Sequence, residues 1–259
     1  MVHRALILLW MLPGVAGAAT VPADGYLAYS GTATALHSSK FLYGERHVVQ
    51  YRAGRIAARV VLYTCADGSA FARKAVQYVD PIAPDFQLDD AANGMLEGIR
   101  SAPNGRAVFF RASRSGTEKS GPLPRDAGLV ADAGFDEFVR ANWQRLMSDK
   151  TLSMPFLVPS RLNDYGFQVQ HVRSEVTAGT PAEVFRLRLG GIWGWFLPGI
   201  DVYYSAADHV LVRYVGLSDL RDASGDNFKT EILFPPQERT AAAEQNMRDA
   251  EQARLAACR

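Results

Sequence analysis

The chain has 259 residues with a formal net charge of +1, and 48% of its residues are hydrophobic. A charge this small excludes the strong basic field that recruits nucleic acid or an anionic membrane surface. The apolar fraction excludes a disordered chain, and the length suits one domain, or two small domains that share a sheet.

The N-terminal segment has the three parts of a secretory signal. A short basic start precedes an apolar run over residues 5–12, and small residues follow at 15–19. This order predicts a signal peptide over residues 1–19, cut after Ala18 or Ala19. The alternative is a buried first helix, since the run is shorter than the roughly 20 apolar residues that span a bilayer. No cysteine directly follows the small residues, so acylation as a bacterial lipoprotein is not expected. We therefore expect an exported protein, periplasmic or secreted, with no transmembrane span in its mature form.

Four strands are predicted in the first part of the mature chain. Ala53-Gly54 suits a two-residue hairpin turn, because Gly accepts the positive φ of the primed turns. Asp67-Gly68 marks a second turn. The predicted strands span residues 26–37, 41–52, 55–65 and 70–79.

Alternation along these strands gives the sheet two faces. If Arg52 pairs with Arg55, an apolar face separates from a basic face, as in an antiparallel sheet with one side on a core. The apolar face then carries Val49, Tyr51, Ile56, Ala58, Val60 and Leu62. The basic face carries Arg46, Gln50, Arg52, Arg55 and Arg59.

Three polar residues are candidates for a ligand site. Glu45 and His47 fall on the apolar face, and Lys74 joins them if the second turn is one residue longer. Glu45 and Lys74 would then flank Leu62 at about 10 Å from each other, since neighbouring strands lie about 4.8 Å apart. One interpretation is a charged patch in a cavity that holds a ligand headgroup. The other is an ion pair at the margin of the sheet.

The middle of the chain holds one clear helix. Prolines and turn dipeptides predict irregular structure over 81–105, with a short strand at 106–112 and a surface loop or loose hairpin at 113–125. Over 134–150, apolar residues recur at helical spacing and predict an amphipathic helix that covers the sheet. Its apolar stripe consists of Phe135, Phe138, Val139, Trp143, Leu146 and Met147.

The second half is again β-rich and ends in a helix. Short turns between its strands imply antiparallel pairing. Residues 237–259 contain no Gly or Pro and are rich in Ala, Glu and Arg, which predicts a C-terminal helix. The predicted strands span 151–158, 165–176, 183–189, 200–205, 209–217 and 228–234.

The only two cysteines are Cys65 and Cys258. In an oxidising compartment an even pair is a candidate disulfide, which would tie the C-terminal helix to the sheet. The alternative is two unpaired thiols, because sequence does not supply the short Cα separation that a disulfide needs.

An aromatic stretch between Gly190 and Gly199 is the most unusual part of the sequence. Its four glycines and one proline disfavour a helix or a central strand. Trp193, Trp195 and Phe196 predict either an exposed loop that meets a membrane surface or gates a cavity, or a buried loop that caps the core.

Catalytic and metal motifs are not found in the sequence. There is no G-x-S-x-G, H-E-x-x-H, C-x-x-C or phosphate-binding glycine loop. We therefore predict no catalytic residues, no metal and no cofactor, and an enzyme is the least favoured class.

Several short patterns resemble a group of exported bacterial proteins of unknown function. The patterns are Tyr43-x-Glu45-x-His47, Tyr51-x-x-Gly54, Arg59-x-Val61-x-Tyr63, Asp67-Gly68, Ala72-x-Lys74, Asp132-Ala133-Gly134-Phe135-Asp136, Phe156-x-Val158-Pro159-Ser160-Arg161-Leu162, Tyr214-x-Gly216-Leu217-Ser218 and Arg221-Asp222. This resemblance implies no activity. More distantly, the expected architecture is similar to the periplasmic lipoprotein-carrier folds, which bind acyl chains in a half-open barrel. None of the carriers' functional residues matches a position here.

The sequence thus predicts an α+β fold, with a large curved antiparallel sheet or incomplete β-barrel covered by helix 134–150. A β-rich domain over 20–236 would follow the signal peptide and precede the C-terminal helix. The favoured function is non-catalytic binding of a lipid or an acylated protein, with Glu45, His47, Lys74, Trp193, Trp195 and Phe196 as candidate ligand residues. The alternative is an envelope interaction or structural protein that needs no cavity.

Overall fold

The computed structural model describes residues 21–125, 127–191, 199–222 and 224–258. The predicted signal peptide therefore lies outside the described residues. The elements are β1 Gly25–Ala35, β2 Phe41–Arg52, β3 Arg55–Thr64, β4 Ala70–Gln77, β5 Asp85–Asp90, β6 Met95–Ala102, β7 Gly105–Arg111, β8 Lys119–Pro122, η1 Asp132–Gly134, α1 Phe135–Ala141, α2 Trp143–Met147, β9 Leu152–Val158, η2 Pro159–Arg161, β10 Asn163–Thr177, β11 Thr180–Leu189, β12 Ile200–Ser205, β13 Leu211–Arg221, β14 Asn227–Leu233, η4 Pro236–Glu238, β15 Thr240–Ala242 and α3 Glu244–Gln252.

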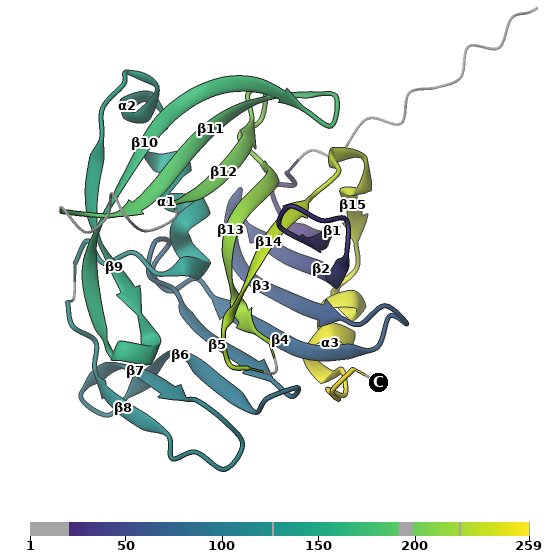
Figure 1. Cartoon of the computed structure of the whole chain (residues 1–259), viewed down its shortest axis with the longest axis vertical. Coiled ribbons are helices and arrows are strands. Elements are labelled where there is room, and N and C mark those ends of the chain that lie inside the picture. Colours follow the sequence, from purple (N-terminus) through teal and green to yellow (C-terminus); the bar gives the residue numbers. More distant parts are fainter. Residues whose placement is uncertain (1–20, 126, 192–198, 223, 259) are drawn as a thin grey trace, which may run out of the picture.

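One antiparallel sheet contains all of these strands. Its order is β8-β7-β6-β5-β4-β3-β2-β1-β14-β13-β12-β11-β10-β9, and β15 pairs with β1. The sheet curls around η1 and α1, as Figure 1 shows, and no strand pairing between β8 and β9 closes it within the described residues. Instead η2, which follows β9, packs against β6 and β7. The predicted α+β class, with a large curved antiparallel sheet, is confirmed.

The hairpin between β2 and β3 has the predicted turn and the predicted pairing of Arg52 with Arg55, but the faces predicted for β3 from Ala58 onward are wrong. Ala53 and Gly54 both adopt positive φ, at 49° and 71°. Next to the turn, however, Tyr51 pairs with Ile56 while Gln50 pairs with Ala58, so Ala57 is one extra residue in β3. A bulge of this kind exchanges the faces of the residues beyond it.

The exchange puts different residues on the two faces. Val48, Ala58, Val60 and Leu62 lie together on the convex face, whereas Arg59 lies on the concave face with Val49 and Tyr51. Arg59 is thus inside the molecule rather than on a solvated basic face.

The region predicted as irregular contains two full strands, β5 and β6. Asp90 is fully buried at the end of β5. Its carboxylate accepts hydrogen bonds from the Ala92 amide at 2.8 Å and from Asn93 Nδ2 at 3.0 Å. The charge therefore orders the turn into β6, which is a common role for Asp before a turn. β8 lies in the stretch for which a surface loop or loose hairpin was predicted.

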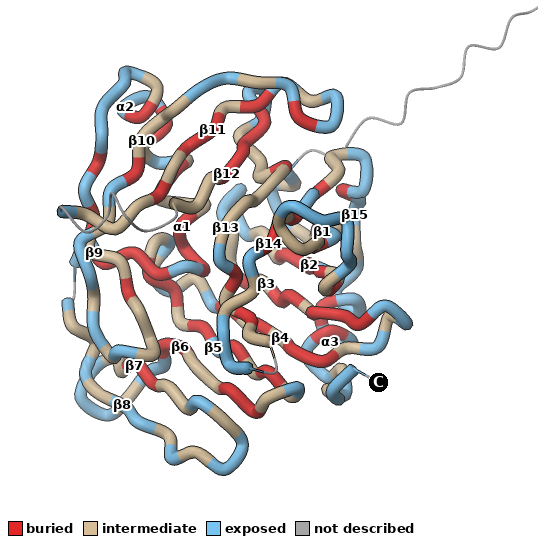
Figure 2. Tube along the Cα trace, in the orientation of Figure 1, coloured by how far each residue is buried: buried red, intermediate tan, exposed pale blue. Residues whose placement is uncertain are grey.

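The predicted mid-chain helix is present as two shorter helices. α1 and α2 meet at Asn142, which is not helical and whose side chain donates to the Phe138 carbonyl at 2.9 Å. The predicted apolar stripe is nevertheless buried, and it packs against β10, β11 and β12. Buried residues, red in Figure 2, run along α1 and the central strands, so α1 forms part of the core inside the curve.

The C-terminal helix is much shorter than predicted. Before it, β15 pairs with β1, and α3 occupies only nine residues. Its buried Met247 and Ala250 pack on Val48, Ala58 and Val60 of the convex face. None of the described helices has the length and apolarity that crossing a membrane requires.

The tail beyond α3 is held along β3 and β4. Arg73 Nη1 donates to the carbonyls of Glu251 and Ala253, and the Ala256 amide donates to the Ala70 carbonyl. Cys258 then forms a disulfide with Cys65 across 193 residues of sequence. The segment is joined to the sheet by a covalent bond as well as by packing.

Candidate functional site

Glu45 and His47 lie two residues apart on the concave face of β2, and each is 7% exposed. Residues at this spacing point to the same side of a strand. The Glu45 carboxylate and His47 Nε2 are 2.7 Å apart. The His47 ring stacks on Tyr29 with centroids 4.3 Å apart and meets Phe234 edge-on at 5.6 Å.

His47 is neutral in this environment. Burial lowers its pKa below the usual value, although the bond to Glu45 acts in the opposite direction. A neutral ring that donates Nε2–H to Glu45 leaves Nδ1 as an acceptor. Nδ1 is buried and has no hydrogen-bond partner.

Lys74 shares this face, but its predicted relation to Glu45 is wrong. Glu45 pairs with Tyr63, whereas Lys74 pairs with Val61, which in turn pairs with His47. There are two reasons: the bulge at Ala57 shifts the β2–β3 pairing by one residue, and the β3–β4 pairing also lies one residue away from the predicted Leu62–Lys74 register. The structure therefore contains no Glu45–Lys74 ion pair among its described residues.

Two aspartates bind Lys74 instead. Its Nζ lies 2.6 Å from Asp132 Oδ2, and it also contacts Asp219 Oδ2. Burial alone would lower the pKa of Lys74, but the two carboxylates outweigh burial and raise it well above its usual value. Lys74 is thus a charged ammonium group deep inside the curved sheet.

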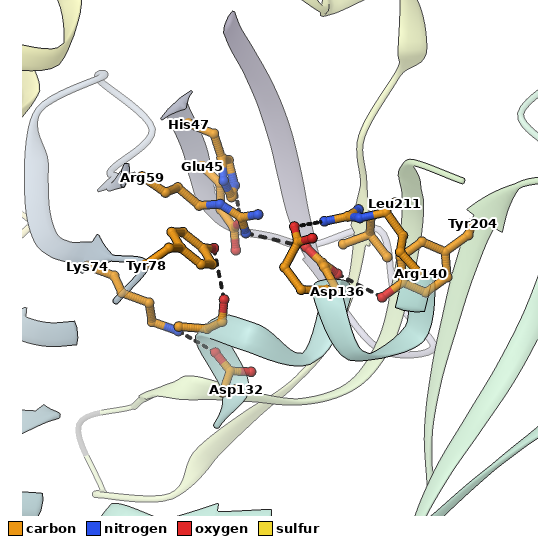
Figure 3. Close-up of polar contacts among 12 residues, drawn as sticks. Glu45, His47, Arg59, Lys74, Tyr78, Asp132, Asp136, Arg140, Tyr204 and Leu211 are labelled. Carbon is orange, nitrogen blue, oxygen red and sulfur yellow. Dashed lines mark hydrogen bonds and ion pairs between the residues drawn. The ribbon is translucent and has the colours of Figure 1, made fainter. Parts of the chain in front are cut away.

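A second ion pair joins α1 to the sheet. Arg59 Nη1 lies 3.3 Å from Asp136 Oδ2, and Tyr204 Oη donates to Asp136 Oδ1 at 2.7 Å (Figure 3). Burial would raise the pKa of Asp136, but Arg59 and Arg140 outweigh it and lower the pKa. Arg59 Nε is buried without a partner.

One short segment supplies an anionic partner to both Arg59 and Lys74. Asp132 begins η1 and Asp136 lies in the first turn of α1, four residues later. Figure 3 shows Lys74 and Arg59 pointing from the strands toward this segment. These aspartates and Arg59 were not predicted as site residues, although all three occur in the patterns that carry the family resemblance.

The charged side chains border two cavities. Cavity 1, about 130 Å³, is lined by Tyr29, Tyr43, Glu45, His47, Arg59, Val61, Tyr63, Lys74, Val76, Asp132, Ala133, Phe135, Asp136, Val202, Leu211, Tyr214, Ser218, Asp219, Ile232 and Phe234. Cavity 2, about 200 Å³, is lined by Phe86, Glu97, Ala131, Asp132, Phe135, Phe156, Leu157, Val158, Pro159, Ser160, Leu187, Ile200, Val202, Tyr214, Leu217, Asp219, Arg221 and Asn227. The cavities adjoin, because Asp132, Phe135, Val202, Tyr214 and Asp219 line both.

One transverse row of the sheet connects the polar groups of the two cavities. Across β1 to β7, consecutive partners in this row are Tyr29, His47, Val61, Lys74, Leu88, Glu97 and Phe110. Directly paired residues share a face, so His47, Lys74 and Glu97 all face the concave side. They occupy every second strand and are separated by Val61 and Leu88.

Glu97 is the unusual member of this row. Burial raises its pKa to about 8, with a further contribution from the charge of Asp219, while Lys74 and Arg221 act against the rise. Burial and Asp219 similarly raise the pKa of Asp132 to about 6, although 47% of its side chain is accessible to water. Glu97 is therefore largely protonated at neutral pH, and Asp132 is largely ionised.

The candidate residues Trp193, Trp195 and Phe196 lie outside the described residues. Among the residues that are described, no group of three or more His, Cys, Asp or Glu side chains is placed to hold a metal ion. The charges at the site are mostly paired within the protein, an arrangement suited to positioning a ligand among apolar walls.

Searches with protein-family models and with curated proteins gave no match. Among solved structures, a β-barrel-like protein of a domain of unknown function (DUF1849) from Brucella abortus matches with a TM-score of 0.45 and 7% identity, over 82% of this chain and 98% of that one. A domain from Vibrio parahaemolyticus, provisionally assigned to outer membrane lipoprotein sorting, matches with a TM-score of 0.31 and 9% identity, over 89% and 92%. A DUF1329 family protein from Desulfovibrio piger matches with a TM-score of 0.27 and 9% identity, over 86% and 88%.

These matches include a lipoprotein-sorting domain, the kind of architecture that the sequence was expected to resemble distantly. Similarity at this level describes architecture and does not transfer an activity.

Proposed function

We propose that the chain is exported and binds a hydrophobic or lipid-like ligand, without catalysis, in cavities 1 and 2. The observation that carries the proposal is a pair of adjoining cavities inside the curved sheet, bordered by aromatic and aliphatic side chains. Protein interiors are normally close-packed, and a cavity of about 150 Å³ lined by apolar groups holds a molecule the size of benzene. The space is thus large enough for part of an acyl chain or ring.

The polar groups of the cavities support the same proposal. His47 Nδ1 and Arg59 Nε are buried without partners. An unsatisfied buried polar group costs about 1–3 kcal/mol, so such groups are retained where something other than the protein satisfies them. Ligand sites typically combine apolar walls with a few polar groups that fix orientation.

Native mass spectrometry of protein purified without detergent tests this proposal. We expect an added mass that organic extraction recovers as a lipid-like compound, on a chain whose own mass shows cleavage after Ala18 or Ala19. The variant Ile200→Trp, which fills part of cavity 2, should lose the added mass. Val176→Trp is the matched control, because Val176 is 69% exposed and lines neither cavity.

The outcomes separate clearly. An added mass that Ile200→Trp removes and Val176→Trp retains supports binding in the cavities. A clean mass for the wild-type chain contradicts the proposal and favours an envelope interaction protein. An uncleaved N-terminus contradicts export alone.

A further inference from the structure

Glu97 differs from the other charged side chains that line the cavities. Glu45, Asp132, Asp136 and Asp219 all have a charged or histidine partner within the protein. Glu97 lines cavity 2, and within the described part of the chain its side chain forms no hydrogen bond or ion pair. A carboxyl group in such a position has room for a partner that the protein does not supply.

A second unpartnered acceptor lies in cavity 1. His47 is 93% buried, since only 7% is exposed, and its free Nδ1 presents a lone pair rather than a hydrogen. His47 and Glu97 lie in the same transverse row, on either side of Lys74. Each of these two acceptors is thus without a hydrogen-bond donor, although Arg59 Nε in cavity 1 and Arg221 Nε in cavity 2 are buried donors without a partner.

The charge balance of the site points to a cation. The two cavities are lined by five carboxyl groups, Glu45, Glu97, Asp132, Asp136 and Asp219, and by three cationic side chains, Arg59, Lys74 and Arg221. Five negative and three positive charges leave two negative charges when Glu97 is ionised, or one when it is protonated. The whole chain, in contrast, carries a net charge of +1. The acidic excess is thus a property of the site.

Arg221 does not supply the missing partner of Glu97. Its Nη1 donates to the Gly225 carbonyl at 3.2 Å, and its guanidinium lies 5.7 Å from the centre of the Phe110 ring. Lys74 is already bound between Asp132 and Asp219. Within the described residues neither cation forms an ion pair with Glu97, although Arg221 Nε is buried without a hydrogen-bond partner.

We propose that the ligand is an organic cation with an apolar tail, whose ammonium group lies beside Glu97 and Asp219 in cavity 2. The tail would pack on the apolar wall formed by Phe86, Phe156 and Leu157. An ammonium group donates hydrogen bonds, balances the acidic excess and lets Glu97 ionise. A carboxylate ligand of the same length would add a negative charge to an already acidic site. This inference rests on the proposed function and specifies its ligand class.

Isothermal titration calorimetry with three probes of equal chain length tests the inference. At pH 7, octylamine should bind the wild-type protein about tenfold more tightly than octanol, and octanoate should bind most weakly. Glu97→Gln keeps the size of the side chain and removes its charge. It should weaken octylamine binding by about tenfold while leaving octanol binding within about twofold. Glu238→Gln is the matched control, because Glu238 is exposed and lines neither cavity.

Proton release provides a readout that a purely structural role of Glu97 would not change. Repeating the titration in buffers of different ionisation enthalpy measures the protons released at pH 7. Octylamine should release up to about one proton from the wild-type protein and almost none from Glu97→Gln, because Glu97 is largely protonated before the cation binds.

The results distinguish this inference from the proposed function. Equal affinities for octylamine and octanol, or an unchanged octylamine affinity in Glu97→Gln, would overturn the cationic ligand and leave hydrophobic binding intact. Binding of none of the three probes would also overturn it. The proposed function is tested separately and is contradicted by a wild-type protein that shows no added mass by native mass spectrometry.

Discussion

The two faces of β2 and β3 are buried in different ways. On the convex face, Val48, Ala58 and Val60 pack against Met247 and Ala250 of α3, and this contact is apolar. On the concave face, the same two strands present charged and aromatic side chains to α1 and to cavity 1. Residues adjacent in sequence thus belong to two unlike environments.

This difference separates stability from ligand binding. Apolar packing under α3 needs no specific geometry beyond shape and volume, so its residues contribute mainly to stability. Buried charges are costly unless each is paired in good geometry, and they are weak evidence for stability. A chain that keeps an acidic, incompletely filled interior next to a well-packed outer face suggests that the interior has a second role.

Removing the disulfide should cause the largest loss of stability, because the disulfide holds the segment that includes α3 on the sheet. Cys65→Ala combined with Cys258→Ala should lower the free energy of unfolding by about 4 kcal/mol, because the cross-link joins residues 193 positions apart. Urea denaturation measures the loss, and octanol binding should persist in the folded double variant.

The single variant Cys258→Ala, kept reduced, is the control, because it removes the disulfide but keeps the buried Cys65 side chain. It should lose about as much stability as the double variant. A loss below about 1 kcal/mol would mean that α3 and the tail dock on the sheet without help from the covalent bond.

Lys74→Met tests the concave side. It leaves Asp132 and Asp219 next to each other without their cation, which should cost about 3 kcal/mol in urea denaturation. Adding Asp219→Asn should recover part of that loss. Lys229→Met, at an exposed position of β14, should change stability by no more than about 0.5 kcal/mol. If Lys74→Met were as stable as the wild-type protein, the ion pairs would not hold η1 to the sheet.

Features that depend on neighbouring residues in the chain could be predicted from the sequence. The Ala53-Gly54 turn and the apolar stripe beginning at Phe135 depend on near neighbours in the chain, and both occur in the structure. The extra residue Ala57 could not be predicted, since neither Gly nor Pro marks that position. This bulge reversed the face expected for Arg59, and together with a one-residue difference in the β3–β4 pairing it moved Lys74 to another row.

The partners of the candidate site depend on the tertiary fold. Asp132 and Asp136 look like ordinary acidic residues at the start of a helix, which the helix dipole favours. Only the position of η1 and α1 inside the curve brings them to Lys74 and Arg59. Glu97 was missed because turn dipeptides on either side of β6 predicted irregular structure there, and an isolated Glu in such a segment gives no functional signal.

The smallest expected effect is a pH dependence that arises from Glu97 alone. Its pKa is raised from 4.5 to about 8 in the folded protein. Between these values the folded state keeps a proton that the unfolded state has released, so stability falls as pH rises. From pH 7 to 8.5 the free energy of unfolding should fall by about 1 kcal/mol. This is less than the full pKa shift would give, because water can enter the cavity beside this carboxyl group.

The pH window isolates Glu97 from its neighbours. Asp132, with a pKa of about 6, is ionised throughout it, and His47, whose pKa is lowered from 6.5, is neutral. Glu97→Gln should therefore show a flatter stability profile from pH 7 to 8.5 in urea denaturation, whereas Glu238→Gln should follow the wild-type protein. Saturating octylamine should flatten the wild-type slope, because Glu97 paired with ammonium is ionised in the folded complex just as it is in the unfolded chain over this range. A wild-type profile that is already flat would place Glu97 in water, and the concave face would then lose the acidic centre that distinguishes it from the convex face.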